Sequence, residues 1–538
     1  MPRVLLVYPE FRSQSFWNYR DTCALIDARY PAAPLGLVTV AAMLPKDWEL
    51  RLVDRNVDTL TDADLGWADM VFTGGMLPQQ LDCLALIRKA RAMGKTVVVG
   101  GPDATSSPHL YNEAQHLILG EAEVTLPPFL TDLAAGEAQH IYQSEQKADV
   151  STSPLPRFDL LKFDRYNHIG VQWCRGCPFN CEFCDIIELF GRVPRAKGTE
   201  QMLAELQRLY DLGYRGHVDL VDDNFIGNKK LVKQFLPHLK AWLEQRDWPF
   251  EFTTEASVNL ADDEELMRLM QEVGFFAVFV GIESPDEETL KQTQKKQNTR
   301  RSLAESIQKM YAHGFFVNAG FILGFDSEKS GVAKGIVGCI EDTSIPAAMV
   351  GLLYALPNTQ LTRRLKSEGR LHEGSDMQPD GIGDQCTAGI NYDSLRPKLD
   401  ILRDYLQVIE TVYEPEAYFG RVARVARQLD SSKRKFKPSF SRWALEFKGF
   451  LRMAWIFTKD GATRGPFWRT FLGGLIANPR SIRLTGDMIG LYVHFGPFSK
   501  FVAARIRAAI AQEEAAQAQG QVAVRATACG WLLKRSRG

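Results

Sequence analysis

The stretch that decides the fold is Trp173-Cys174-Arg175-Gly176-Cys177-Pro178-Phe179-Asn180-Cys181-Glu182-Phe183-Cys184. It holds four of the nine cysteines in a chain of 538 residues, which is too sparse a set for a disulfide framework. Cysteines gathered so closely in an otherwise cysteine-poor chain indicate a metal site. Thiolate ligands favour iron–sulfur clusters or zinc.

The spacing within this stretch favours a cluster. Cys177, Cys181 and Cys184 form a CxxxCxxC pattern that can hold three irons of a [4Fe-4S] cube and leave the fourth iron open. The alternative pairs Cys174 and Cys177 with Cys181 and Cys184 as a structural zinc site in a binding protein. That pairing leaves only three residues between the two halves, which is tight for zinc.

Six strand–helix repeats surround the cysteines and predict a partial β/α barrel over 167–395. The expected strands are 168–173, 217–221, 251–254, 277–281, 317–322 and 348–353. Polar or glycine residues lie at or beyond several strand ends, where barrel active sites form. These candidate site residues are Asp222, Asp223, Glu255, Glu283, Ser284 and Gly324.

Residues 1–145 also alternate apolar strands with helices, which predicts a Rossmann-like parallel sheet. Two of the expected strands run into glycine pairs, and the second pair is followed by proline: Gly74, Gly75, Gly100, Gly101 and Pro102. Ligands sit beyond such strand ends, although the glycines could equally serve tight turns alone. The first strand is not followed by GxGxxG, which argues against a nicotinamide site.

The rest of the chain divides into a linker over 146–166, a helical domain over 396–511 and a mobile tail over 512–538. Residues 431–510 carry 15 basic and 3 acidic residues, a net charge of +12 within a chain of net charge −1. Aromatic residues at 440, 443, 447 and 450 share one helical face. Core packing and contact with a membrane surface both explain this pattern, and nucleic-acid binding explains it less well.

The CxxxCxxC pattern with Phe183 before its last cysteine resembles the radical S-adenosylmethionine superfamily. The resemblance implies that S-adenosylmethionine chelates the open iron beside Phe183. It also implies that Glu255, Glu283, Ser284 and Gly324 hold this cofactor. Asp222 and Asp223 would then serve the catalytic site.

The first domain looks like the cobalamin-binding domain that precedes this barrel in one large subgroup, with an inert Rossmann-like module as the alternative. The resemblance implies cobalamin contacts at the two glycine pairs, Pro102 and Glu121 of Gly120-Glu121-Ala122-Glu123. No DxHxxG motif is present, so no histidine is expected beneath the cobalt.

Further motifs resemble cobalamin-dependent radical enzymes with a helical carboxyl-terminal extension, a group that includes hopanoid carbon-2 methyltransferases. These motifs are Ser15-Phe16-Trp17-Asn18-Tyr19, Ala33-Pro34-Leu35-Gly36-Leu37 and Gly191-Arg192-Val193-Pro194-Arg195. The implied activity is methyl transfer to an unactivated carbon, with a small molecule or a hopanoid lipid as substrate. Oxidative cyclisation, a tetrapyrrole and another natural product are the alternatives.

The implied partner is an electron donor such as flavodoxin or ferredoxin, and no nucleic acid is expected. No apolar run approaches the ~18 residues that span a bilayer, and no signal peptide is evident. We therefore expect a cytoplasmic protein that contacts the inner face of the membrane through 431–510.

Overall fold

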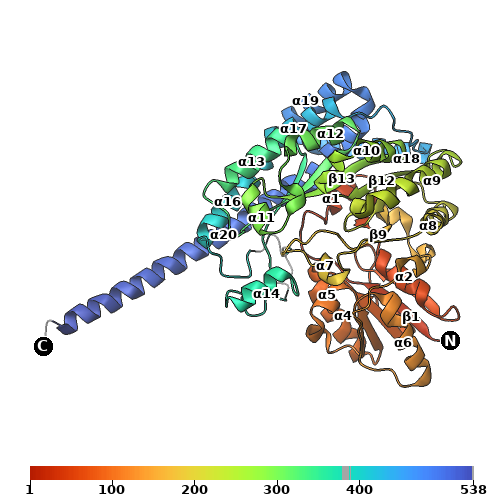
Figure 1. Ribbon diagram of the computed structural model, residues 1–538, viewed down its shortest axis with the longest axis horizontal. Coiled ribbons are helices and arrows are strands. Elements are labelled where there is room, and N and C mark those ends of the chain that lie inside the picture. The colour runs from red at the N-terminus through yellow and green to blue at the C-terminus, as the bar shows by residue number, and fades with distance from the viewer. Residues whose placement is uncertain (378–383, 385–386, 388, 536–538) are drawn as a thin grey trace.

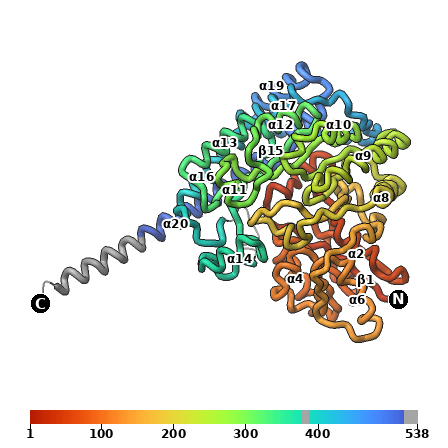
Figure 2. The backbone as a smooth tube through the Cα atoms, in the orientation of Figure 1, coloured from red at the N-terminus to blue at the C-terminus, as the bar shows by residue number. Residues whose placement is uncertain are grey.

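The computed structural model describes residues 1–377, 384, 387 and 389–535, and the side chains of 519–535 are left undescribed. The chain forms a Rossmann-like amino-terminal domain, an open β/α barrel and a carboxyl-terminal group of helices (Figure 1). Figure 2 shows the barrel between the amino-terminal domain and the last helices. The predicted fold class is confirmed.

The amino-terminal sheet is parallel throughout, with the order β3-β1-β4-β5-β6-β7. Its strands are β1 (Arg3–Tyr8), β3 (Glu49–Asp54), β4 (Met70–Gly74), β5 (Thr96–Gly100), β6 (His116–Ile118) and β7 (Ile141–Tyr142). Alternate residues of β1 enter different cores: Leu5 and Val7 pack on one face, and Val4 and Leu6 on the other. Both faces are covered by helices: α2 (Leu35–Met43), α3 (Asp62–Trp67), α4 (Gln80–Ala92), α5 (Pro102–Ser106) and α6 (Ala122–Ala135).

The barrel sheet is also parallel and stays open, with the order β15-β14-β13-β12-β11-β8-β2. Its strands are β8 (Tyr166–Val171), β11 (Gly216–Leu220), β12 (Phe250–Glu255), β13 (Phe275–Glu283), β14 (Phe316–Leu323) and β15 (Ala347–Leu352). All six predicted strands are present. The helices between and after them are α7 (Ile186–Leu189), α8 (Thr199–Asp211), α9 (Lys229–Glu244), α10 (Glu264–Glu272), α11 (Glu287–Gln292), α12 (Leu303–Ala312), α13 (Val332–Thr343) and α14 (Gln360–Ser367).

The seventh strand, β2 (Tyr30–Ala32), was not expected, because it comes from the segment assigned to the first domain. Tyr30 pairs with Tyr166 and Ala32 with His168, so this short segment extends the barrel sheet beyond β8. The preceding α1 (Arg20–Ala24) lies against α20, and the Thr22 hydroxyl donates to the Gly490 carbonyl at 3.0 Å. Residues 15–32 therefore serve the barrel and the carboxyl-terminal helices.

Five helices dominate the carboxyl-terminal region: α16 (Lys398–Val412), α17 (Pro415–Gln428), α18 (Phe440–Lys459), α19 (Gly461–Ala477) and α20 (Ile482–Arg535). They cover the edge strand β15, whose carbonyls at Val350 and Ala348 accept from the hydroxyls of Tyr405 at 3.0 Å and Tyr413 at 2.5 Å. Covering an edge strand removes an unpaired row of backbone groups. None of the described helices is long and apolar enough to cross a membrane.

Two strand ends of the amino-terminal sheet approach so closely that only glycine fits. A Cβ atom added to Gly74 at the end of β4 would collide with the Gly100 carbonyl at the end of β5. Gly101 has a φ of +91°, a conformation that glycine adopts without steric cost. The backbone therefore requires glycine at Gly74 and favours it at Gly101, whether or not a ligand binds beside them.

We predict that Gly74→Ala lowers the free energy of unfolding by about 1–3 kcal/mol through backbone displacement. Gly66→Ala is the matched control, because Gly66 lies within α3 with no atom within 4 Å of the added Cβ. The control should hold or slightly raise stability, since alanine is the better helix former. Thermal unfolding of both variants checks the difference, and equal midpoints would contradict the close-approach argument.

Candidate functional site

The cysteine loop leaves β8 and is held by a short antiparallel ribbon. β9 (Cys174–Arg175) pairs with β10 (Arg195–Ala196), so Cys174 lies opposite Ala196. Gly176 has a φ of +91°, and a Cβ there would lie 2.9 Å from the Gly191 carbonyl oxygen. The Cys177 amide donates to that same carbonyl at 3.3 Å. The segment 191–196 thus fixes the backbone from which the first cluster cysteine projects.

Two carboxylates after β11 bind the same loop. Asp222 accepts the backbone amides of Trp173 at 2.7 Å and Cys174 at 3.0 Å. Asp223 accepts the amide of Gly176 at 2.8 Å. Burial raises the pKa of Asp222 to about 8 and that of Asp223 to about 6. Both residues line the cavity described below, and we had predicted them as catalytic; the structure shows that they first position the cysteine loop.

The three predicted ligands share an environment suited to thiolates. Burial raises the pKa of each thiol, and the Lys295 ammonium opposes that rise at Cys177, Cys181 and Cys184. The amide of Asn224 lies 4.0 Å from the Cys177 sulfur, and the amide of Gln297 lies 3.8 Å from the Cys181 sulfur. Amide hydrogen bonds and a nearby cation are the usual means of stabilising cluster sulfurs.

Within the described residues, no three His, Cys, Asp or Glu side chains converge on a single metal ion. A single zinc ion requires such convergence. A cubic cluster instead takes one thiolate on each of three irons, so its cysteines need not meet at one point. The three free cysteines are therefore compatible with a cluster.

Cys174 differs from the three predicted cluster ligands in the contact that its thiol makes. Its side chain is buried, and its thiol donates to the Asn224 carbonyl at 3.6 Å. Burial and the nearby Asp222 raise its pKa well above the usual range, so it stays a thiol. The sequence alone could not show this, because Cys174 lies at a CxxC spacing from Cys177.

A cavity of about 1310 Å³ lies between the three parts of the chain. Its wall includes Phe183, Asp185 and Ile186 from the cysteine loop, and the three cysteines lie beside this wall rather than within it. The amino-terminal domain contributes Met76, Leu77, Pro78, Pro102, Asp103 and Ser106. The carboxyl-terminal helices contribute mainly apolar side chains, among them Phe447, Phe450, Met453, Phe471, Leu491 and Phe495.

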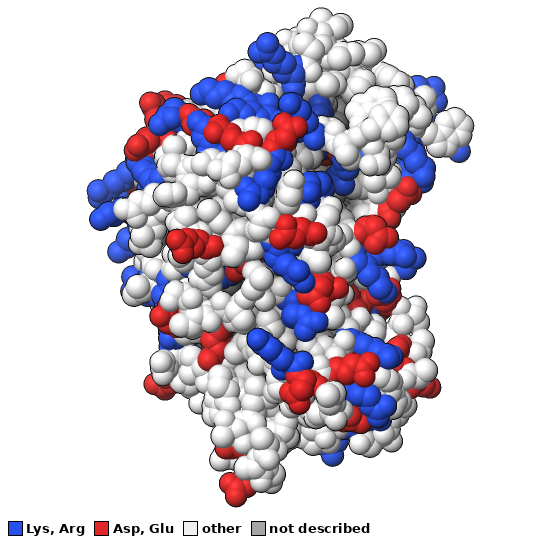
Figure 3. All heavy atoms as spheres, turned by 90° about the vertical axis from the view of Figure 1, so that its right-hand side faces the viewer, with Lys and Arg blue, Asp and Glu red and all other residues white. Residues whose placement is uncertain are grey.

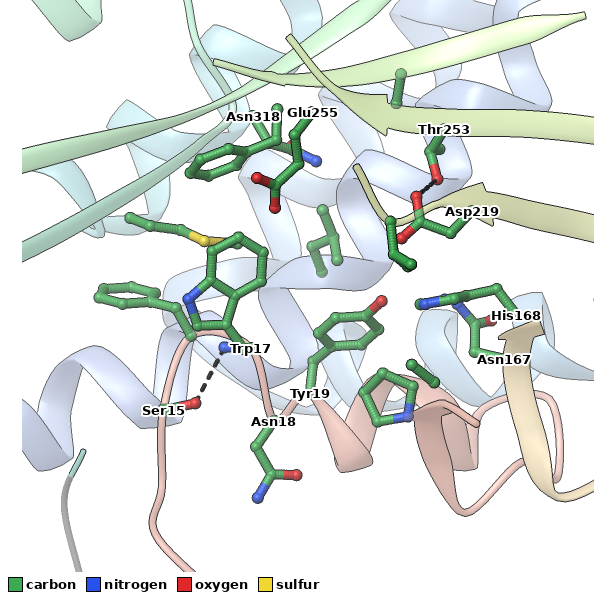
Figure 4. A pocket seen from close by; sticks show the side chains of 18 of the residues that line it. Ser15, Trp17, Asn18, Tyr19, Asn167, His168, Asp219, Thr253, Glu255 and Asn318 are labelled. Carbon is green, nitrogen blue, oxygen red and sulfur yellow. Dashed lines mark hydrogen bonds between the residues drawn. The ribbon is translucent and has the colours of Figure 1, made fainter. Parts of the chain in front are cut away.

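A group of polar side chains inside the barrel was missed from the sequence (Figure 4). The Thr253 hydroxyl lies 2.6 Å from His217 Nε2 and donates to Asp219 at 2.5 Å. His168 Nδ1 and Asn318 Oδ1 are buried, and neither has a hydrogen-bond partner among the residues that the structure describes. All five line the cavity, and Figure 4 shows His168, Asp219, Thr253 and Asn318 around it. These residues lie within the strands, where polar side chains alternate with apolar ones in the sequence, whereas the predicted site residues lie at or beyond the strand ends.

Of the residues predicted to hold S-adenosylmethionine, two line the cavity and two do not. Glu255 lines the cavity, and Figure 4 shows its carboxylate directed inward. Desolvation by the cavity wall, followed by the charge of Asp219, raises the pKa of Glu255, although the side chain is exposed to the cavity. Glu283 also lines the cavity; it has a φ of +65° and pairs with Lys295 at 2.7 Å. This lysine was not singled out from the sequence, although it binds Glu283 and faces the thiols.

Ser284 and Gly324 lie outside the cavity wall. The Ser284 hydroxyl accepts the Asp286 amide at 3.1 Å. The Gly324 amide donates to Glu328, and its carbonyl accepts from the Tyr392 hydroxyl at 2.7 Å. Cofactor contacts at these two positions stay predictions.

Glu121, predicted to contact cobalamin, forms ion pairs within the protein. Its carboxylate pairs with Arg175 at 3.0 Å and with Arg195 at 2.9 Å, and it does not line the cavity. Glu123 pairs with Arg175 at 2.7 Å. The Gly120–Glu123 motif therefore links the amino-terminal domain to the cysteine loop.

Among the predicted cobalamin contacts, Pro102 lines the cavity, whereas the four glycines form the strand ends behind it. No histidine of residues 1–145 lines the cavity, all of which the structure describes. His109 pairs with Asp376, and His116 and His140 contact backbone carbonyls.

We predict that Asp222→Ala costs about 2–4 kcal/mol of stability, because two buried amides lose their acceptor. Asp222→Asn keeps an acceptor and is the matched control. The raised folded pKa means that the wild-type protein loses stability as the pH rises from the unfolded value of 3.8 towards 8. The stability of D222N relative to wild type should therefore increase over that window. Denaturant unfolding at both ends of the window checks this, and a constant difference would contradict the assignment.

Three family models match the chain: the B12 binding domain over residues 22–130, the Radical SAM superfamily over 171–330 and a domain of unknown function, DUF4070, over 359–508. An uncharacterized methyltransferase of Synechocystis sp. is 46% identical over 482 residues, covering 89% of this chain and 88% of that protein. The hopanoid C-2 methylase of Rhodopseudomonas palustris is 34% identical over 426 residues, covering 78% of each chain.

Two solved structures share the fold. The cobalamin-dependent S-adenosylmethionine radical enzyme OxsB, with aqua-cobalamin and S-adenosylmethionine bound, has a TM-score of 0.59 at 16% identity, covering 97% of this chain and 81% of that one. The methyltransferase TsrM of Kitasatospora setae, with cobalamin and a [4Fe-4S] cluster bound, has a TM-score of 0.56 at 15% identity, covering 89% and 99%.

The family models, the extent of the identities and the position of the cysteine loop at the cavity agree. This chain belongs to the cobalamin-dependent radical S-adenosylmethionine methyltransferases, whose cofactors are a [4Fe-4S] cluster, S-adenosylmethionine and cobalamin.

Proposed function

We propose that this enzyme methylates an unactivated carbon of a hopanoid lipid. The 34% identity to a hopanoid C-2 methylase supports the substrate class. The observation that carries the proposal is the cavity, which extends from the cysteine loop to the aromatic and aliphatic inner faces of α18, α19 and α20. A rigid polycyclic hydrocarbon bound there would bury this apolar wall, and each Å² of apolar surface removed from water stabilises the complex by roughly 25 cal/mol.

The residues present fit the cluster. Cys177, Cys181 and Cys184 would hold it, with Lys295 placing a positive charge nearby. The Phe183 ring lines the cavity next to Cys184 and lies 5.9 Å from the Lys295 ammonium. Glu283 holds that ammonium in place through its 2.7 Å ion pair.

The cavity also fits a large cofactor together with a substrate. Pockets for a single small molecule usually measure about 300–1,000 Å³, and this one measures about 1310 Å³. Met76, Leu77, Pro78 and Pro102 would carry cobalamin on the side of the amino-terminal domain. The close strand ends at Gly74 and Gly100 set the position of these loops.

When bound, the three cofactors supply the methyl group and the means of removing hydrogen from carbon. The chain's own residues orient the reactants and exclude water. Glu255, on the cavity wall, is available to bind S-adenosylmethionine. Phe447, Phe450 and Phe471 form an apolar wall for a hydrocarbon skeleton.

Product analysis tests the substrate class. Anaerobically purified holoenzyme is supplied with methyl-labelled S-adenosylmethionine, a reductant such as flavodoxin and a hopanoid hydrocarbon. We expect labelled methyl in the lipid fraction. A labelled tetrapyrrole or other natural product, with no label in the hopanoid, would overturn the lipid proposal. An unlabelled cyclised or oxidised product would show that the chemistry itself differs.

We predict that Cys181→Ala abolishes retention of the full cluster, because one iron loses its thiolate. Cys174→Ala should retain full iron and sulfide, since that thiol bonds to the Asn224 carbonyl instead. Iron and acid-labile sulfide analysis of the two anaerobic proteins distinguishes them. Full iron in C181A, or equal loss in both variants, would contradict the ligand assignment.

A further inference from the structure

One face of α18 exposes large apolar side chains that the rest of the protein leaves uncovered. Phe440, Trp443, Phe447, Leu451 and Trp455 are each between 49% and 82% exposed, and they recur every three or four residues along the helix. Trp443 stacks on Phe447 with 5.6 Å between ring centroids. On α19, Leu472, Leu475 and Ile476 are also exposed. We call these eight residues the exposed apolar face.

The opposite side of α18 is firmly docked, so the exposure does not come from a loose helix. A Cβ on Gly449 would lie 3.1 Å from the Leu25 carbonyl oxygen. Arg452 donates to that carbonyl at 2.9 Å, and Lys448 pairs with Asp27 at 3.0 Å. Met453 and Phe457 are buried. The predicted helical aromatic face is therefore split: part is core, and part faces outward.

Basic residues accompany the exposed apolar face. Lys459, Arg464 and Arg480 are exposed, and within the described part of the chain none of them forms an ion pair with a carboxylate. The two acidic residues of 440–480 are both engaged within the protein. Glu446 pairs with Arg442 and Arg483, and Asp460 accepts the Ala462 amide. Figure 3 shows a wide white area with blue side chains around it in the upper part of the molecule, where α18 and α19 lie.

The same helix reaches the cavity. Phe447 is 49% exposed and also lines the cavity. Arg442, Phe450 and Met453 on α18 line the cavity as well. The exposed apolar face and the cavity wall therefore share Phe447.

We propose that the exposed apolar face docks on an anionic phospholipid bilayer and that a lipid substrate enters the cavity beside Phe447. Helices that lie in a membrane interface typically combine aromatic and aliphatic side chains with neighbouring Lys and Arg residues. Each basic residue near an anionic leaflet is attracted to it. A protein partner would need acidic groups matched to these cations, and a second copy of this chain presents basic residues there instead. The entry route rests on the proposed function; the docking does not.

The docking is tested with the full-length holoenzyme and sedimented vesicles. One set contains phosphatidylcholine with phosphatidylglycerol, and the other contains phosphatidylcholine alone. We expect binding to the anionic vesicles and a loss of about tenfold in the bound-to-free ratio for F440S/W443S/W455S. The matched control is I141S/L395S, which changes exposed apolar residues elsewhere and should bind as wild type does. Unchanged binding of the triple variant, or dimerisation that the same variant abolishes, would overturn the proposal.

A second measurement guards against misfolding of the triple variant. Brominated phospholipid should quench tryptophan fluorescence of the wild-type protein, and W443F/W455F, which keeps the face apolar, should bind with less quenching. Equal quenching in both would contradict insertion of these rings.

The entry route is tested separately by comparing turnover of vesicle-borne and detergent-solubilised hopanoid. F440S/W443S/W455S should lose the first and keep the second. Equal turnover of both by the variant would overturn the route. If the wild type binds vesicles but methylates neither form, the lipid substrate fails while the docking stands.

Discussion

The cofactor site depends on Arg175, which joins the cysteine loop to the amino-terminal domain. Its side chain is almost buried and binds Glu121 and Glu123 at once. Burial alone would raise the pKa of Glu123, but the hydrogen bonds from Arg175 hold it at about 2. Removing one partner of such a buried pair commonly costs about 3–5 kcal/mol, because the other charge is left unpaired. The arginine therefore fixes the two domains that enclose the cavity.

The same loop is held from its other side by the barrel. Asp222 and Asp223, which follow β11, accept hydrogen bonds from three backbone amides of the loop. The loop is therefore held on one side by these two carboxylates and on the other by the ion pairs between Arg175 and the amino-terminal domain. Backbone held this tightly presents its thiols in a fixed arrangement. Such preorganisation is what a cluster with one open iron requires, since the protein alone positions the reactants around it.

The carboxyl-terminal helices complete the barrel rather than forming an independent module. Glu251, near the start of β12, pairs with Arg434 and with Arg483 of α20, and both arginines come from the basic stretch. Two cations of the basic stretch therefore have a structural use beside β12. Three others, Lys459, Arg464 and Arg480, accompany the exposed apolar face, so one basic stretch contributes both to folding and to that surface.

Local pattern was sufficient for much of the fold and for the cluster ligands. The barrel strands appear as apolar runs, and their boundaries shift by only a residue or two from those predicted. The CxxxCxxC spacing identifies its ligands because the three thiolates come from one short loop. Strand β2 could not be predicted, because three residues carry little periodicity and their pairing depends on β8, more than 130 residues away.

Side-chain roles were decided only by tertiary contacts. Glu121 belongs to a motif that resembles a cofactor contact, yet two arginines from the second domain bind its carboxylate. The sequence likewise could not separate core packing from a membrane surface on α18, because both require apolar residues at helical spacing. The sequence by itself determined the fold class and the three cluster cysteines, since these follow from local spacing. Only the tertiary structure decided which polar groups face the cavity and which side of α18 stays exposed, because burial depends on segments that are distant in the chain.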